Sequence, residues 1–205
     1  MSKQGTSQWF ADRTGCLTAS NMRAAMSRLK NGNDSADRAA LKVQILAERL
    51  TGDVVHHYVT GPMQHGIDTE PLAKAAYMAA TGSLIADCEF IRHPTIEHFG
   101  ASPDGRIEAR LGIEVKCPTT AKFLSWRLAG AVPDEHKPQM IAQAVCAGFD
   151  AVEFVAFDPR LPKHLQLFVV RFTPTQEERD AVEQAAREFL DEVEAMFKQL
   201  TEETA

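Results

Sequence analysis

An acidic turn and the Glu-x-Lys strand that follows it are the part of this sequence with the clearest potential for chemistry. Asp104 lies in a Pro-Asp-Gly turn, and Glu114 and Lys116 follow with one residue between them. Side chains two apart on a strand share a face, so Glu114 and Lys116 should point the same way. If the flanking segments pair as a hairpin, Asp104 comes close to Glu114. Two carboxylates would then converge at a sheet edge, where oxygen ligands suit a hard divalent cation and the lysine can hold or activate a water.

This pattern has a second interpretation. Asp-x9-Glu-x-Lys occurs often by chance in charged proteins, and the same residues could form a surface hairpin with solvated charges. The spacing does not separate the two interpretations, so the rest of the chain has to decide between them.

Length and composition indicate one globular α/β domain that spans residues 1–205, with a core over about 9–197. The chain has 205 residues, of which 44% are hydrophobic and 24% are charged; both fractions are ordinary for a folded domain. The formal net charge of −6 gives no overall basic character. This counts against bulk electrostatic binding to nucleic acid but leaves room for a local basic groove.

The cysteines and the apolar segments exclude several classes of protein. The four cysteines are dispersed without Cys-x-x-Cys spacing, so neither a zinc knuckle nor a clustered iron–sulfur site is indicated. No apolar run approaches the roughly 20 residues that span a bilayer. The first residues lack the apolar stretch of a signal peptide. We therefore expect a cytoplasmic protein with no membrane association.

Hydrophobic periodicity and capping signals predict helices that enclose a β-rich middle. Residues 1–19 look irregular, with Trp9 as a core anchor. Helices are expected over 20–29, 35–52, 61–80, 120–128, 136–147 and 175–200. Strands are expected over 84–91, 98–102, 105–109, 112–117, 151–157 and 165–172. This order predicts a mixed central β-sheet flanked by helices.

Several motifs in order resemble a restriction-endonuclease-like nuclease core. They are Glu70 in a Gly-x3-Glu helix, Ser-Pro-Asp104-Gly, Glu114-Val-Lys116-Cys-Pro and Gln139-x3-Gln143. Further motifs match the phage lambda exonuclease, or YqaJ-type viral recombinase, family more closely. They are Trp9-x3-Arg13-x-Gly15-x2-Thr18-Ala19-Ser20, Ala47-Glu48-x2-Thr51-Gly52 and Phe157-Asp158-Pro159-Arg160. The likeness covers nearly the whole chain, from about Trp9 to Phe197.

The resemblance implies a Mg²⁺-dependent 5′→3′ exonuclease that degrades one strand of linear double-stranded DNA. Its products would be mononucleotides and a 3′ overhang, and each site would take two metal ions, with Mn²⁺ as an alternative. The family also implies a ring-shaped homotrimer that works beside a single-strand annealing protein. The setting would be homologous recombination by a phage or prophage in a bacterial host.

The family's catalytic roles fall on five positions of this chain. By that analogy, Asp104, Glu114 and the carbonyl of Val115 bind the metal, and Glu70 reaches the second metal position. Lys116 orients the attacking water and lowers its pKa. Phosphodiester hydrolysis needs charge stabilisation and an activated water, and these residue types can supply both.

Three more positions match the groups that hold phosphate in the family. Gln139 would contact the phosphate or the water, and Arg13 and Ser20 would grip the 5′-terminal phosphate. A guanidinium suits this role because its fork pairs bidentately with phosphate oxygens. Each has an ordinary alternative: Gln139 could lie on a helix surface, Arg13 could pair with Asp12 or Asp34, and Ser20 could cap a helix.

Two other functions remain open from the sequence. One is a DNA-end-binding protein that kept the fold and lost the chemistry. The other is a helicase-associated nuclease, although such proteins often carry a C-terminal cysteine cluster and no cysteine follows Cys146. A ring around DNA also needs a basic inner wall. Its candidate residues are Lys42, Arg49, Lys74, Arg92, Arg106, Lys122, Arg127 and Lys137.

Overall fold

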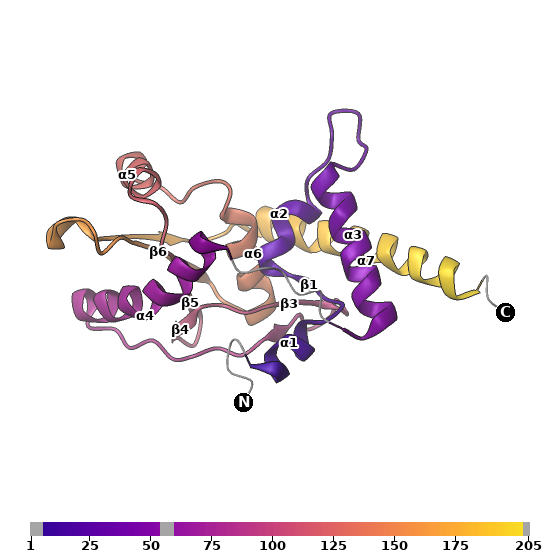
Figure 1. Ribbon diagram of the computed structural model, residues 1–205, viewed down its shortest axis with the longest axis horizontal. Helices are drawn as coiled ribbons and strands as arrows, with labels where there is room; N and C mark the ends of the chain where they lie inside the picture. Colours follow the sequence, from indigo (N-terminus) through magenta and orange to yellow (C-terminus); the bar gives the residue numbers. More distant parts are fainter. Residues whose placement is uncertain (1–5, 54–59, 203–205) are drawn as a thin grey trace.

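Two β-sheets organise the chain in the computed structural model, which describes residues 6–53 and 60–202 (Figure 1). The first sheet has the order β1-β3-β2, and the second has the order β4-β5-β6-β7. The strands are β1 (Leu17–Thr18), β2 (Ile91–Arg92), β3 (Phe99–Ala101), β4 (Gly105–Glu108), β5 (Leu111–Lys116), β6 (Ala151–Phe157) and β7 (Leu167–Phe172). The mixed α/β class predicted from the sequence is confirmed, but the strands divide over two sheets instead of forming one.

Helices cover both sheets. The α-helices are α1 (Ser7–Arg13), α2 (Met22–Ala25), α3 (Ala36–Thr51), α4 (Gly61–Thr81), α5 (Thr120–Ala129), α6 (Lys137–Ala147) and α7 (Gln176–Glu202). The short 3-10 helices are η1 (Ala19–Asn21) and η2 (Lys163–Leu165). The C-terminal part of α7 extends beyond the rest of the molecule, and α5 lies toward the opposite end (Figure 1). Within the described ranges, no helix is long and apolar enough to cross a bilayer.

The second sheet is mixed and holds the predicted catalytic strand β5 in its interior. β5 pairs antiparallel with β4 and parallel with β6, and β6 pairs antiparallel with β7. A parallel neighbour needs a crossover connection, and here α5 and α6 lie between β5 and β6 in the chain.

Alternating side chains on this sheet pack against different helices. Ile113 and Val115 of β5 lie in one buried cluster with Tyr77 of α4. Phe154 of β6 lies in another cluster with Met140 of α6. Because neighbouring strand residues point to opposite faces, α4 covers the face of Val115 and α6 covers the face of Glu114.

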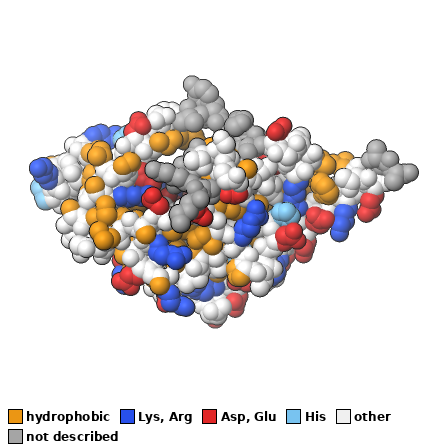
Figure 2. Space-filling view, turned by 90° about the horizontal axis from the view of Figure 1, so that it is seen from below, with side chains coloured by type: hydrophobic (Ala, Val, Ile, Leu, Met, Phe, Trp, Pro, Cys, Tyr) orange, Lys and Arg blue, Asp and Glu red, His pale blue; other side chains and the backbone are white. Residues whose placement is uncertain are grey.

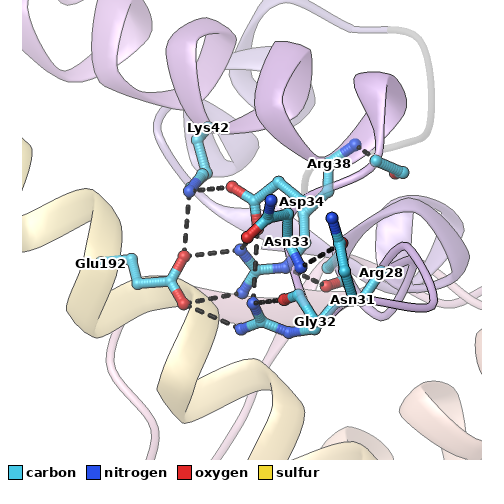
Figure 3. A network of polar contacts seen from close by, with 10 residues as sticks. Arg28, Asn31, Gly32, Asn33, Asp34, Arg38, Lys42 and Glu192 are labelled. Atoms are coloured by element: carbon cyan, nitrogen blue, oxygen red, sulfur yellow. Dashed lines mark hydrogen bonds and ion pairs between the residues drawn. The ribbon is translucent and has the colours of Figure 1, made fainter.

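An ion-pair network joins α7 to α3 and to the segment between α2 and α3 (Figure 3). Arg38 is 1% exposed and pairs with Asp34 and with Glu192 of α7. Lys42 and Arg28 contact the same two carboxylates. Removing one partner of a buried charge pair leaves the other uncompensated, so this network ties α7 to the first half of the chain.

The structure corrects three predictions for the first half of the chain. Residues 1–19 are not all irregular, because Thr6 caps α1 by accepting a hydrogen bond from the Trp9 N–H. The helix expected over 20–29 ends at Ala25. Of the strand expected over 84–91, only Ile91 belongs to a strand, and Ala86 forms an isolated bridge to β4. Ala86 exchanges two backbone hydrogen bonds with Arg106, and no ladder extends from this bridge among the described residues.

Candidate active site

The predicted hairpin forms and places Asp104 beside β5, the strand that carries the predicted catalytic residues. Gly105 of β4 is opposite Ile113 of β5, so the next position in the register sets Asp104 opposite Glu114. Asp104 Oδ2 accepts a hydrogen bond from the Val115 N–H at 2.7 Å. Gly105 permits this close turn, because a Cβ there would lie 2.3 Å from Ile85 Cγ2.

The Val115 carbonyl faces the same edge as Asp104. In a strand, the N–H and C=O of one residue point to the same side. The Val115 N–H points to Asp104, beyond the first residue of β4. The carbonyl therefore points to this edge too, in the place expected for a backbone metal ligand.

Glu114 is buried beneath this edge and held by donors from α6. Its side chain is 1% exposed. Gln139 Nε2 donates to Oε1 at 2.7 Å, and Gln143 Nε2 donates to Oε2. Lys116 Nζ lies 2.5 Å from Oε1 and 3.4 Å from Gln139 Oε1. Glu114, Lys116 and Gln139 are thus brought together as the sequence suggested.

Glu70 approaches from the opposite face of the sheet, on α4, and pairs with Lys74 at 2.7 Å. The negative charge of Glu70 acts on the ionisation of Asp104. The pKa of Asp104 is raised well above its usual value, first by burial and then by the charges of Glu114 and Glu70. Three carboxylates from β5, α4 and the turn therefore share one electrostatic environment.

The donor set of this environment fits a hard divalent cation, although the ligands are not preassembled. Within residues 6–53 and 60–202, no group of three or more His, Cys, Asp or Glu side chains is close enough to hold a metal ion. The oxygens of Glu114 and Glu70 are instead paired with the ammonium groups of Lys116 and Lys74. Carboxylate and carbonyl oxygens are the ligands Mg²⁺ takes, and a cation would offset the repulsion that raises the pKa of Asp104.

Lys116 carries a positive charge in this arrangement. Burial on its own lowers the pKa of its ammonium group, but the charges of Glu114 and Asp104 outweigh burial and raise it. The neighbouring thiol of Cys117 has a pKa raised by burial to about 12, which makes it a poor nucleophile. Lys116 is therefore suited to orient a water or stabilise charge, not to act as a neutral base.

Arg13 lies beside the acidic turn. Its Nη1 donates to Ser102 Oγ at 2.8 Å, and its guanidinium lies 4.1 Å from the Trp9 ring centroid. Burial lowers the pKa of Arg13 to about 10, so it stays charged at neutral pH. Among the described residues, no carboxylate forms an ion pair with Arg13, which excludes pairing with Asp12 or Asp34.

Trp9 is not the core anchor that the sequence predicted, and Ser20 is not a helix cap. Trp9 is not a core residue, because α1 buries none of its side chains; it contacts Arg13 and donates to Ser102 at 3.1 Å. Ser20 is exposed and caps no helix, and its Oγ lies 3.1 Å from Thr18 Oγ1. No hydrogen bond joins Ser20 to Arg13 in the part of the chain that the structure describes.

Most of the expected basic wall is neutralised within the chain. Carboxylates pair with Lys42, Arg49, Lys74, Lys122 and Lys137. On the face shown in Figure 2, Lys and Arg side chains are interspersed with acidic and apolar ones and form no continuous band. Arg13, which forms no ion pair with a carboxylate among the described residues, is therefore the clearest candidate at the site for contact with an anion.

Three residues near the site were given no catalytic, metal-binding or phosphate-binding role in the sequence analysis. Ser102 precedes Asp104 by two positions, and its contacts with α1 have no signal in the local sequence. Gln143 is 0% exposed, and its spacing from Gln139 by one helical turn was the available signal. His136 adjoins the site, and burial lowers its pKa to about 4, so it is neutral at pH 7.

Comparison with known proteins places this fold among the exonucleases. Two crystal structures of the alkaline exonuclease LHK-Exo from Laribacter hongkongensis, one in complex with dAMP, share 34% sequence identity with a TM-score of 0.90. The similarity covers 97% of this chain and 98% of theirs. A phage-related exonuclease from Haemophilus somnus 129PT shares the fold at 16% identity and a TM-score of 0.65, over 93% of this chain and 96% of that one. No curated protein sequence matches.

The fold is therefore restriction-endonuclease-like. The profile of the YqaJ-like viral recombinase domain matches residues 8–150, which contain every predicted site residue. The chain belongs to the YqaJ-like viral recombinase family.

Proposed function

We propose that this protein is a metal-dependent 5′→3′ exonuclease that degrades one strand of linear double-stranded DNA. Family membership and the likeness to an alkaline exonuclease support a nuclease role. The products would be mononucleotides and a 3′ overhang. Such an overhang is the substrate of single-strand annealing, so the reaction would serve phage-type recombination in the cytoplasm of a bacterial host.

The observation that carries the proposal is the position of the Arg13 guanidinium beside the carboxylates, with no carboxylate partner among the described residues. Arg13 binds Ser102, and Ser102 is two residues from Asp104. Two extended residues span at most about 7 Å. A terminal phosphate at Arg13 would therefore place the next phosphate of the same strand near Asp104. This arrangement favours removal of one nucleotide at a time from a 5′ end.

Mg²⁺ is the cofactor that the residues fit best, with Mn²⁺ as an alternative. Asp104, Glu114 and the Val115 carbonyl would hold one ion, and Glu70 would contribute to a second position. When bound, the metal would polarise the phosphate and lower the pKa of a coordinated water. In the protein, Glu114 is fixed by Gln139, and Lys116 would hold the attacking water by its positive charge.

For assembly and partners, we propose a homotrimer that works beside a single-strand annealing protein, in keeping with the family. A homotrimeric ring would keep duplex DNA next to the site through many cycles, and an annealing protein would receive the 3′ strand. Measuring the mass of the particle in solution by light scattering tests the trimer. A monomer at micromolar concentration would contradict it.

A direct test uses linear duplex DNA labelled at the 5′ end, with or without a 5′-phosphate, in Mg²⁺. We expect release of labelled mononucleotide, faster from the phosphorylated end, and no release in EDTA. Cleavage within closed circular DNA would keep the nuclease and contradict the exonuclease. Arg13→Lys should reduce the advantage of the phosphorylated end, because an ammonium cannot form the bidentate contact.

A second candidate is binding to DNA ends without cleavage. The specific observation in its favour is that both oxygens of Glu114 are occupied by protein donors. End binding with no nucleotide release in either Mg²⁺ or Mn²⁺ would support this candidate over the exonuclease.

A further inference from the structure

A buried carboxylate just after β6 orients an exposed guanidinium. Asp158 is 0% exposed. Its Oδ1 accepts a hydrogen bond from Arg160 Nε at 2.7 Å, and its Oδ2 accepts from the Thr120 hydroxyl at 2.6 Å and from Arg160 Nη2 at 3.1 Å. Arg160 Nη2 also donates to the carbonyl of Pro118 at 3.0 Å. Asp158 and Arg160 belong to the Phe-Asp-Pro-Arg motif, to which the proposed function gives no role.

The guanidinium of Arg160 keeps donors that the protein does not use. A guanidinium carries five N–H groups in a rigid planar fork. The contacts with Asp158 and Pro118 occupy Nε and Nη2, whereas Nη1 has no hydrogen-bond partner within residues 6–53 and 60–202. The side chain is 50% exposed. Arg160 therefore offers two N–H groups from a fork whose orientation is already fixed by a buried carboxylate.

The pairing of β5 with β6 puts this guanidinium at the end of the sheet where Lys116 lies. The two strands are parallel, and Lys116 is opposite Ala156, so the residues that follow each strand leave the sheet at the same end. Pro118, which accepts from Arg160, is two residues beyond Lys116. Two residues span at most about 7 Å. Arg160 is therefore a near neighbour of the predicted catalytic residues, although 44 positions separate it from Lys116 in the sequence.

The strand order sets the succession of groups along this end of the sheet. The strands lie in the order β4-β5-β6. Asp104 directly precedes β4, Lys116 ends β5 and Arg160 follows β6. Arg13 contacts Ser102, which is on the β4 side of β5. The two guanidinium groups therefore lie on opposite sides of the strand that carries Lys116.

We propose that Arg160 is a DNA-binding residue whose Nη1 donates to the backbone phosphate that follows the scissile phosphate on the degraded strand. The inference rests on the proposed function, since it assigns a further ligand to the same strand. With the terminal phosphate at Arg13 and the next one near Asp104, the phosphate after that would lie toward β6. The N–H groups of Nε and Nη2 hold the protein carboxylate, and Nη1 is left for an oxygen of this phosphate.

The test measures binding of a short duplex with a 5′-phosphate by fluorescence anisotropy in EDTA. Each of the first three internucleotide phosphates of the 5′-phosphorylated strand is replaced in turn by a neutral methylphosphonate. In the wild type, replacing the second should lower the affinity about ten-fold, the usual effect of losing a charge-assisted hydrogen bond. In Arg160→Gln, the unmodified duplex should bind about ten-fold more weakly, and the second replacement should cause no further loss.

The salt dependence of binding gives an independent readout. The slope of log K against log salt should be smaller by about one in Arg160→Gln, because one phosphate contact is lost. If the second replacement weakens Arg160→Gln as much as the wild type, or if Arg160→Gln cancels the effect of the first or third replacement instead, the inference is overturned.

Arg171→Gln is the matched control. Arg171 is 60% exposed and pairs with a largely buried carboxylate, that of Glu153, as Arg160 does with Asp158. Glu153 is near the start of β6, at the other end of the sheet, so this variant should keep the wild-type salt slope. Arg160→Gln leaves Asp158 without its ionic partner, which can destabilise the fold. If that variant unfolds, the double variant Asp158→Asn with Arg160→Gln removes both charges and is used for the same measurements.

The binding readout keeps this inference distinct from the exonuclease. If Arg160→Gln cancels the effect of the second replacement but the wild type releases no nucleotide with metal, the exonuclease fails and Arg160 keeps its role. If the wild type releases nucleotides but the second replacement acts equally on both proteins, the exonuclease stands and the Arg160 inference fails.

Discussion

Gln143 donates an amide hydrogen bond to Oε2 of Glu114, and both side chains are almost completely buried. Gln139, one helical turn earlier on α6, donates to the other oxygen of the same carboxylate. Gln143 Oε1 has no hydrogen-bond partner within the described residues. A buried acceptor without a partner costs free energy, which suggests that Gln143 is retained for its contact with Glu114.

Gln143→Leu should therefore weaken metal binding. The change removes the donor to Oε2 at nearly constant volume, so Glu114 would no longer be held in one orientation. We expect about a 10- to 100-fold loss in metal affinity or activity, the usual effect of removing a group that orients a metal ligand. Calorimetric titration with Mn²⁺, together with the Mg²⁺ concentration at half-maximal cleavage, measures it. Gln184→Leu, on the exposed side of α7, is the control, and equal metal affinity in the two variants would contradict the role.

Lys116→Ala should abolish cleavage while DNA ends still bind. The side chain places a positive charge 2.5 Å from Glu114, where it can orient a water, whereas Arg13 contacts Ser102. The cleavage rate should fall by about 100-fold or more, with end affinity in EDTA within a few fold of wild type. Lys198→Ala, an exposed lysine on α7, should behave like wild type. Cleavage at the wild-type rate by Lys116→Ala would remove this residue from the mechanism.

Glu192→Gln should destabilise the fold in a pH-dependent way. Although burial raises the pKa of Glu192, hydrogen bonds from Arg38, Lys42 and Arg28 outweigh it and lower the pKa to about 2. A lowered folded pKa gives stability that is present above the unfolded value near 4.3 and lost as the pH falls toward 2. Because about a third of the side chain is exposed, we expect a difference of only about 1–2 kcal/mol at pH 7.

Urea unfolding of Glu192→Gln at pH 7, 4 and 3 measures this contribution. The difference from wild type should shrink progressively below pH 4. Glu188→Gln, one turn earlier on α7 and bonded only to Gln184 among the described residues, should show little change at any pH. A difference that stays constant from pH 7 to pH 3 would exclude an ionic origin.

The sequence predicted the hairpin of β4 and β5 well because its signals are local. A Pro-Asp-Gly turn and a strand with alternating side chains specify the register in a few residues, and the register places Asp104 opposite Glu114. The helices also follow local rules: Thr175 and Glu178 form a capping box at the start of α7, and Gly82 ends α4 in the left-handed region.

The contacts of α1 could not be predicted because they are tertiary. Nothing near Trp9 in the sequence indicates that its ring N–H meets Ser102. The Thr6 cap was a local signal for the helix, but the position of Arg13 depends on Gly15. The Gly15 N–H donates to Glu48, and its carbonyl accepts from Arg49. These contacts between distant segments account for the Gly15 and Glu48 motifs in the sequence, but the motifs alone do not show that the contacts position Arg13.

Asp104→Asn should stabilise the metal-free protein. The pKa of Asp104 is raised by burial, Glu114 and Glu70, so above its unfolded value near 3.9 the folded state binds this proton more tightly than the unfolded state. Stability is therefore lost as the pH rises from about 4 toward the folded pKa, and asparagine removes this loss. At pH 7.5 in EDTA we expect a gain of about 1 kcal/mol or more, or about 2–4 °C in Tm for a chain of this size. Near pH 3.5, where the carboxyl is protonated in both states, the two proteins should unfold at similar temperatures.

Mg²⁺ should raise the Tm of the wild type, because binding to the folded state alone stabilises it, and should have little effect on Asp104→Asn. If the variant is instead less stable than wild type at pH 7.5 in EDTA, the prediction is wrong. The hydrogen bond from the Val115 N–H to Asp104 would then stabilise the fold by more than the buried charge of Asp104 destabilises it.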